Sequence, residues 1–130
     1  QARISVIASL LSKEIESVIL DKTKNPYSAR LIQFQELIDT HFYKERNTEF
    51  YADKLNISTS QLSKICRKYL QASPVQLIHQ RSVLEAKRLL KATDLSVKEI
   101  AFKLGFADAA YFTNFFKKHT GINPRDFRAE

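Results

Sequence analysis

Two stretches of this sequence repeat one another. Residues 51–77 read YADKLNISTSQLSKICRKYLQASPVQL, and residues 100–127 read IAFKLGFADAAYFTNFFKKHTGINPRDF. Each contains Ala-x-x-Leu, a short turn, a stripe of apolar residues and a polar residue followed by proline. The offset between the copies is 49 residues before the turn and 50 residues after it, so the second copy has one additional residue. This internal repeat predicts one supersecondary unit that is used twice.

Each copy has the pattern of a helix-turn-helix. A short helix ends at Ala-x-x-Leu and is followed by Asn56 in the first copy and Gly105 in the second, residue types that tolerate a positive φ. Ser58 and Asp108 then stand where a second helix needs a side chain to cap its first turn. We therefore expect two helix-turn-helix motifs. Their expected ranges are about residues 49–70 and 96–119.

One long helix is expected between the two motifs. Ser73-Pro74 places a capping residue before a proline at the first helical position. From there to residue 92 the apolar residues keep a helical spacing, and no residue breaks the pattern. A helix of this length spans roughly 30 Å. We therefore expect a linker helix over about residues 73–92.

The composition favours an all-α domain. Hydrophobic residues make up 44% and charged residues 27% of the 130 residues, which is typical of a folded globular chain. With only 2 glycines and 3 prolines, the sequence has too few turn residues for many short hairpins. The expected fold is two helix-turn-helix subdomains joined by a long linker helix, with an extra N-terminal helix.

The charge of the chain favours a polyanionic partner. There are 21 Lys and Arg against 14 Asp and Glu, a formal net charge of +7. Residues 1–29 hold 4 basic and 3 acidic groups (+1), whereas residues 30–130 hold 17 and 11 (+6). A basic helix-turn-helix segment is typical of a nucleic-acid-binding protein.

The sequence lacks the residues that several classes of protein require. Two distant glycines provide no glycine-rich loop for a nucleotide, which argues against kinases and P-loop proteins. One cysteine and three scattered histidines form no disulfide or zinc pattern. We expect no catalytic residues, no metal and no cofactor, and we do not expect an enzyme. No apolar run is long enough for a membrane span, so we expect a cytoplasmic protein.

The second helix of each motif has an apolar face and a polar face. The expected buried stripes are Leu62, Ile65, Cys66 and Tyr69 in the first copy, and Phe112, Phe115, Phe116 and His119 in the second. The outward faces correspond at an offset of 50 residues: Ser60, Ser63, Lys64 and Arg67 against Ala110, Thr113, Asn114 and Lys117. Asn, Lys, Ser and Thr suit base edges in the major groove, whereas alanine has only an apolar contact to a thymine methyl to offer.

The sequence resembles a known family of regulators. The residues that carry the resemblance are Ala-x-x-Leu-Gly-Phe, Tyr111-Phe112, Phe116-Lys117-Lys118, Thr120-Gly121 and Asn123-Pro124-x-x-Phe127-Arg128, with Glu85-Ala86-x-Arg88-Leu89-Leu90 on the linker helix. They are similar to the C-terminal DNA-binding domain of AraC/XylS-type transcription regulators. The similarity covers about residues 30–130. One departure is Gln71, which stands where the family commonly has a glycine.

The resemblance implies sequence-specific binding of double-stranded DNA by two helix-turn-helix motifs in adjacent major-groove segments. Together with the outward faces, the resemblance implies which residues contact bases. They are Ser60, Gln61, Ser63, Lys64, Ala110, Thr113 and Asn114. The expected phosphate contacts are Ser58, Arg67, Lys68, Asp108, Lys117 and Lys118. We expect a bacterial transcription regulator with RNA polymerase as a further partner; an activator is favoured, although no residue of the sequence distinguishes activation from repression.

The N-terminal residues match no part of that module. Ile4, Ala8, Leu11, Ile15 and Val18 form one helical stripe, and the polar segment with Pro26 that follows is typical of a linker. We expect residues 1–28 to be an N-terminal helix and linker that end an upstream sensing or dimerisation domain, with residues 29–130 as the DNA-binding domain. Residues 4–19 either pack against another domain or form the interface of a homodimer. A homodimer could also form through an absent upstream domain.

Two alternative functions stay open at this level. A basic helical module that docks on an acidic protein would have the same composition. An architectural protein would bind DNA without choosing a sequence. Both alternatives predict that no DNA sequence is preferred.

Overall fold

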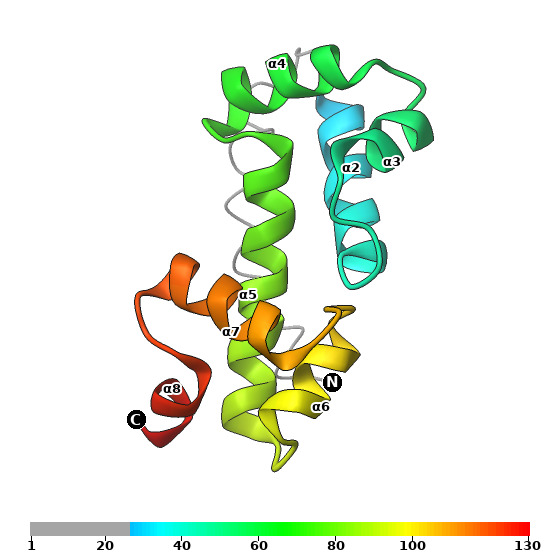
Figure 1. The fold of residues 1–130 in the computed structure, drawn as a ribbon. Helices are drawn as coiled ribbons and strands as arrows, with labels where there is room; N and C mark the ends of the chain where they lie inside the picture. The colour runs from blue at the N-terminus through cyan, green and yellow to red at the C-terminus, as the bar shows by residue number, and fades with distance from the viewer. Residues whose placement is uncertain (1–26) are drawn as a thin grey trace. The chain divides into compact units, whose positions relative to one another are not determined.

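The computed structural model describes residues 27–130, so the helix expected at residues 4–19 lies outside the described residues. The described part consists of helices without a strand (Figure 1). The helices are α2 (Ser28–His41), α3 (Thr48–Lys54), α4 (Thr59–Leu70), α5 (Pro74–Ala92), α6 (Val97–Lys103), α7 (Ala109–Thr120) and α8 (Pro124–Ala129). The all-α prediction is therefore confirmed for this part of the chain.

Two compact units divide the chain, one ending at Ile78 and the other comprising His79–Glu130. The boundary falls within α5. Helices α2, α3 and α4 belong to the first unit, and α6, α7 and α8 belong to the second. Each unit therefore contains one copy of the repeated sequence.

The core of the first unit forms around the apolar faces of α2, α3 and α4. Phe34 and Tyr51 are almost fully buried, and their rings meet edge to face with centroids 5.6 Å apart. The Tyr51 hydroxyl donates a 2.6 Å hydrogen bond to the Glu45 carbonyl oxygen. Burial, with a smaller contribution from the charge of Glu45, raises the pKa of this hydroxyl well above its usual range. Tyr51 therefore remains a neutral donor that joins α3 to the loop before it.

The core of the second unit is aromatic. Phe112 and Phe116 of α7 are fully buried, and Phe106 packs on Phe112 at 5.3 Å. Phe116 meets Phe127 of α8 edge to face at 5.5 Å. Arg128 then donates hydrogen bonds to carbonyl oxygens near the end of α5, at Leu90 (2.9 Å) and Thr93 (3.3 Å). The short helix α8 is thus held by both packing and charge-assisted hydrogen bonds.

The two turns repeat one another bond for bond. The Ile57 N–H donates to the Ala52 carbonyl oxygen at 3.1 Å, and the Phe106 N–H donates to the Ala101 carbonyl oxygen at 2.9 Å. Between these partners the backbone takes a left-handed conformation, with φ of 58° at Asn56 and 81° at Gly105. The predicted positive φ at Asn56 and at Gly105 is confirmed.

Helix α5 buries only part of its apolar pattern. Leu77, Val83 and Leu84 belong to that pattern but are only half-buried. The buried residues are Pro74, Ile78, Ser82, Ala86, Leu89 and Leu90. Each step of four residues turns by about 40° around a helix, so this row of buried positions shifts gradually around α5 along its length. Because Ser82 is polar, a search for apolar residues alone does not find the row.

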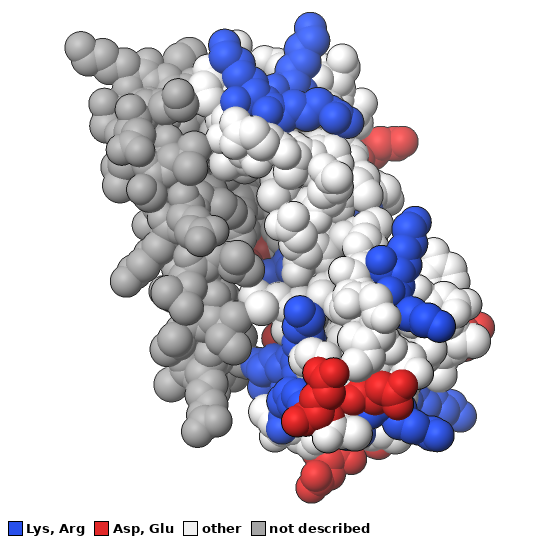
Figure 2. Space-filling model, turned by 90° about the vertical axis from the view of Figure 1, so that its left-hand side faces the viewer, with Lys and Arg blue, Asp and Glu red and all other residues white. Residues whose placement is uncertain are grey.

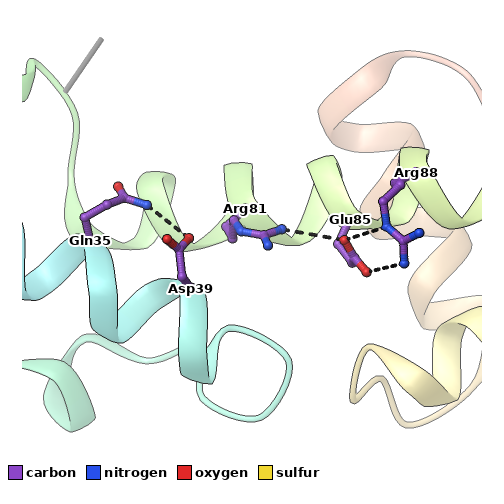
Figure 3. A network of polar contacts seen from close by, with 5 residues as sticks. All are labelled: Gln35, Asp39, Arg81, Glu85 and Arg88. Carbon is purple, nitrogen blue, oxygen red and sulfur yellow. Dashed lines mark hydrogen bonds and ion pairs between the residues drawn. The ribbon is translucent and has the colours of Figure 1, made fainter. Parts of the chain in front are cut away.

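Further polar contacts support the helices within each unit. On α5, Arg88 makes a two-pronged contact to the Glu85 carboxylate at 3.2 and 2.9 Å, and Arg81 lies 3.8 Å from the same carboxylate (Figure 3). On α2, the Gln35 amide donates to Asp39 at 3.2 Å (Figure 3). Pairs three and four residues apart stabilise a helix modestly.

The ends of α4 and α7 differ in one respect. Each helix ends in the left-handed conformation, but the residue is Gln71 (φ 53°) after α4 and Gly121 (φ 83°) after α7. A side chain makes this conformation costly, whereas glycine adopts it freely. The departure from the family pattern at Gln71 therefore leaves the backbone turn intact but strained.

This difference predicts opposite effects of two substitutions. Gln71→Gly should raise the free energy of unfolding by about 0.5–1 kcal/mol, because it removes the cost of a side chain at positive φ. Gly121→Ala should lower it by about 1 kcal/mol, although a Cβ there meets no atom within 4 Å. Urea unfolding followed by circular dichroism measures both. A destabilised Gln71→Gly variant would mean that the 3.2 Å hydrogen bond from the Gln71 amide to the Lys68 carbonyl oxygen outweighs the strain.

Candidate nucleic-acid interface

Helix α4 begins with a capped turn and presents a polar face. Ser58 Oγ accepts a 3.0 Å hydrogen bond from the Gln61 N–H, as the sequence predicted. Ser60, Gln61 and Lys64 are exposed, and Ser63 is half-buried on the flank of this face. The predicted buried residues Leu62, Ile65 and Cys66 are confirmed, while Tyr69 is half-buried. The expected base-contacting side chains of the first motif therefore lie on the solvent side of one helix, with Ser63 at its margin.

Helix α7 is built in the same way. Asp108 Oδ1 accepts a 2.7 Å hydrogen bond from the Tyr111 N–H, which confirms Asp108 as the cap. Ala110 and Asn114 are exposed, and Thr113 is half-buried like its counterpart Ser63. The expected residues of the second motif thus occupy the same positions on their helix as those of the first.

The four basic side chains expected at phosphates are all exposed. Arg67 and Lys68 lie in the last turns of α4, and Lys117 and Lys118 lie in the last turns of α7. Positive side chains are favoured there by the negative end of the helix dipole. The Lys68 ammonium also lies 5.4 Å from the centre of the Tyr69 ring. These groups are free of acidic ion-pair partners among the contacts that the described residues make.

Figure 2 shows that the basic excess is not uniform. On the face drawn there, acidic side chains lie beside basic ones near the lower edge. Net charge alone therefore does not select a surface that faces a polyanion. The two capped helices with polar outward faces are a more specific feature than the total charge.

The prediction that His119 belongs to the buried stripe of α7 is wrong. His119 is exposed and Phe115 is only half-buried, because the buried positions of α7 follow a spacing of four residues through Phe112 and Phe116. The His119 ring packs at the margin, with its centroid 4.5 Å from Phe115 and 5.1 Å from His79. Partial burial and the nearby Lys118 lower the pKa of His119, which favours its neutral form.

Cys66 has the properties of a core thiol. The residue is fully buried on α4 and forms no disulfide. Burial raises the pKa of the thiol to about 12. A thiol that stays protonated is a poor nucleophile and a poor metal ligand.

Two further observations limit the chemistry of the described part. Among residues 27–130, no three His, Cys, Asp or Glu side chains are grouped in a way that suits a metal ion. In the same range, no helix has both the length and the apolar character that crossing a membrane requires.

Two exposed aromatic side chains were missing from the predicted sites. Tyr111 in the first turn of α7 is 62% exposed, and Phe102 on α6 is 83% exposed. Phe102 borders a groove of about 550 Å³ lined by α6 and by the turn before α7. The repeat contained the information needed to find both. The offset pairs Tyr111 with Gln61, and it pairs Phe102 with Asp53, which are both exposed.

Known proteins share these features. A family model described as a helix-turn-helix domain matches residues 51–130. A transcriptional regulator of the AraC-type DNA-binding domain group from Chromobacterium violaceum superposes with a TM-score of 0.70 at 25% identity, covering 78% of this chain and 90% of that one. This chain belongs to the AraC/XylS-type helix-turn-helix family. The family assignment made from the sequence is therefore confirmed.

Two other relatives bear on what the family does. The transcriptional activator RhaS of Enterobacter sp. (strain 638) is 30% identical over 100 residues, which are 77% of this chain and 36% of that protein. This AraC-type chain thus spans about a third of the length of that relative. The DNA-binding domain of AdpA, a global transcriptional factor whose structure is in complex with a target DNA, superposes with a TM-score of 0.66 at 25% identity, covering 81% of this chain and 91% of that one.

The buried thiol of this AraC-type chain leads to a simple prediction. Cys66 should react with iodoacetamide at pH 8 at least about a hundredfold more slowly in the folded protein than in urea, because it is both inaccessible and protonated. Mass spectrometry of quenched samples measures the rates. The matched control combines Cys66→Ser with Lys68→Cys, which moves the only thiol to an exposed position two residues away. Equal rates for folded wild type and this control would contradict a buried Cys66.

Proposed function

We propose that this chain binds double-stranded DNA sequence-specifically and regulates transcription. The observation that carries the proposal is the pair of matched outward faces on α4 and α7, each capped at its N-terminus and each followed by two exposed basic residues. The family, the activator named among the relatives and the DNA complex of the AdpA domain all support it. A basic chain without these matched faces would fit a general polyanion binder equally well.

In this proposal α4 and α7 enter adjacent segments of the major groove. Lys64 suits guanine and Asn114 suits adenine, while Ser60, Gln61, Ser63 and Thr113 contribute shorter contacts to base edges. Ala110 contributes an apolar contact. Arg67, Lys68, Lys117 and Lys118 pair with phosphates. Ser58 and Asp108 act through the caps, because they orient the first-turn N–H groups that donate to a phosphate at a helix N-terminus.

The experiment that tests this function is selection of duplexes from a random pool. We expect a converged site with two blocks about one helical turn apart, roughly 34 Å. A pool that binds strongly in low salt but never converges would favour the architectural alternative. If no DNA is retained at any salt concentration, the alternative of a basic module that docks on an acidic protein becomes the better explanation.

Two lysines should respond differently on the selected site. Lys64→Ala should weaken binding by about 1–3 kcal/mol and relax the preference at one base pair. Lys117→Ala should weaken binding to all duplexes alike and reduce the salt slope by about 1. Fluorescence anisotropy at several salt concentrations, with the selected and a scrambled duplex, separates the two effects. The role of Lys64 in base reading fails if its variant discriminates between the duplexes as well as wild type does.

We also propose that RNA polymerase is a partner, as expected for an activator. The described surface that best suits a protein partner is the groove beside α6, where Phe102 is 83% exposed. Phe102→Glu should leave affinity for the selected duplex within about twofold but reduce transcription from a promoter carrying that site, because large exposed apolar groups at functional surfaces serve protein contacts. Phe102→Leu is the matched control that keeps the apolar character. Unchanged transcription with Phe102→Glu would remove this surface from the proposal.

The remaining expectations stay predictions. They are a cytoplasmic location, the domain boundary at residues 28 and 29, and a homodimer through residues 4–19 or an upstream domain. The family supports the proposal that this chain is not an enzyme.

A further inference from the structure

The outward face of α7 is centred differently from the sequence expectation. The fully buried side chains Phe112 and Phe116 define the inner side of the helix. At about 100° per residue, the direction opposite to them coincides with Asn114, and Tyr111 lies about 60° from that direction, compared with about 100° for Thr113. Thr113, in contrast, lies near the edge of the buried side and is half-buried. Tyr111 therefore belongs to the exposed face more fully than Thr113 does.

The internal repeat gives Tyr111 a counterpart with an expected role. An offset of 50 residues superimposes Tyr111 on Gln61, which is exposed in the first turn of α4. The same offset matches the capping hydrogen bonds, since the N–H groups of these two residues donate to Ser58 and Asp108. The two side chains thus leave their helices at the same point of the same turn.

The residues just before Tyr111 have no side-chain group that could form a hydrogen bond to a base. Ala109 and Ala110 precede it, and neither has a hydrogen-bonding side chain. Tyr111 is 62% exposed, so its ring is accessible in this turn. Its inner side is supported by Phe106, whose ring centroid is 5.9 Å away. Phe106 is itself 4% exposed and packed on Phe112, so the support is fixed in the core.

We propose that Tyr111 is a specificity-determining residue of the second motif, and that its ring reads a thymine through the 5-methyl group in the major groove. This rests on the proposed DNA binding and assigns one further contact within it. Aromatic and aliphatic side chains recognise thymine by apolar contact with this methyl group. The phenol hydroxyl, at the far end of the ring, donates to a phosphate oxygen. A ring held by Phe106 loses little conformational freedom on binding, which favours a contact of this kind.

The first test is selection from a random pool by wild type and by Tyr111→Ala. The block read by α7 is identified as the one that changes in Asn114→Ala. In that block, wild type should select a thymine at one position, and Tyr111→Ala should lose the preference at that position alone. Tyr43→Ala is the matched control, because Tyr43 is a 39% exposed tyrosine outside both motifs, and it should select the wild-type site.

The second test removes the methyl group from the DNA. Deoxyuridine in place of the selected thymine should weaken wild-type binding about fourfold, the effect of losing one buried methyl contact. Tyr111→Ala should bind both duplexes equally. Tyr111→Phe should keep the fourfold difference, because the ring remains, while its overall affinity falls slightly with the loss of the hydroxyl. Tyr111→Gln should shift the preference towards adenine, which glutamine recognises by a two-pronged hydrogen bond.

Several outcomes would overturn the proposal. It fails if Tyr111→Ala selects the wild-type site, or if it weakens selected and scrambled duplexes by the same factor, as a phosphate contact would. If Tyr111→Ala does not fold by circular dichroism, the Phe and Gln variants decide: loss of the uracil effect in Phe, or an unchanged site in Gln, overturns it. When wild type itself fails to converge, the proposed function fails together with this inference. When wild type converges and only the Tyr111 effects are absent, the inference fails alone.

Discussion

The left-handed turn between the two helices of each motif is the constraint on which the rest of this structure depends. A second helix packs across the first only if the chain reverses within a few residues, and this reversal requires a positive φ at Asn56 and at Gly105. The hydrogen bonds that close the turns reach back to Ala52 and Ala101, both 1% exposed. A larger side chain at either alanine would separate the helices, so the turn and the buried alanine depend on each other. The turn and the buried alanine of each motif together set the direction in which the polar face of its second helix points.

The same constraint explains why polar recognition and apolar packing coexist on helices of only 12 residues. The cores fix the inner sides of α4 and α7 through the buried residues Leu62, Ile65 and Cys66 in one unit and through Phe112 and Phe116 in the other. The caps at Ser58 and Asp108 fix where each helix begins. With the start and the inner side both determined, the outward side chains have little freedom in register. A rigid helix end is a suitable platform for recognition, because binding then requires little ordering.

Much of this organisation was accessible from the sequence, and the exceptions have identifiable causes. The turns, caps and buried Cys66 followed from residue types whose local preferences agree with their surroundings. His119 was misplaced because residues three and four positions apart both share a helix face, and the sequence does not show that the buried side of α7 is centred on Phe112 and Phe116, away from His119. The buried side of α5 could not be read from apolar residues alone, because Ser82 is polar yet buried. Tyr111 and Phe102 were missed because an aromatic residue in a helix reads as core unless its position is compared with the other copy.

The burial of Cys66 affects how the protein reacts with oxidants. The sequence contains no methionine and no tryptophan, and its single sulfur atom lies in the core of the first unit. Oxidation of a protein by peroxide begins at accessible thiolates and thioethers. Neither group is accessible here, so the folded domain has no side chain that peroxide modifies readily. The folded domain is therefore expected to resist peroxide better than a domain with an exposed thiol or thioether.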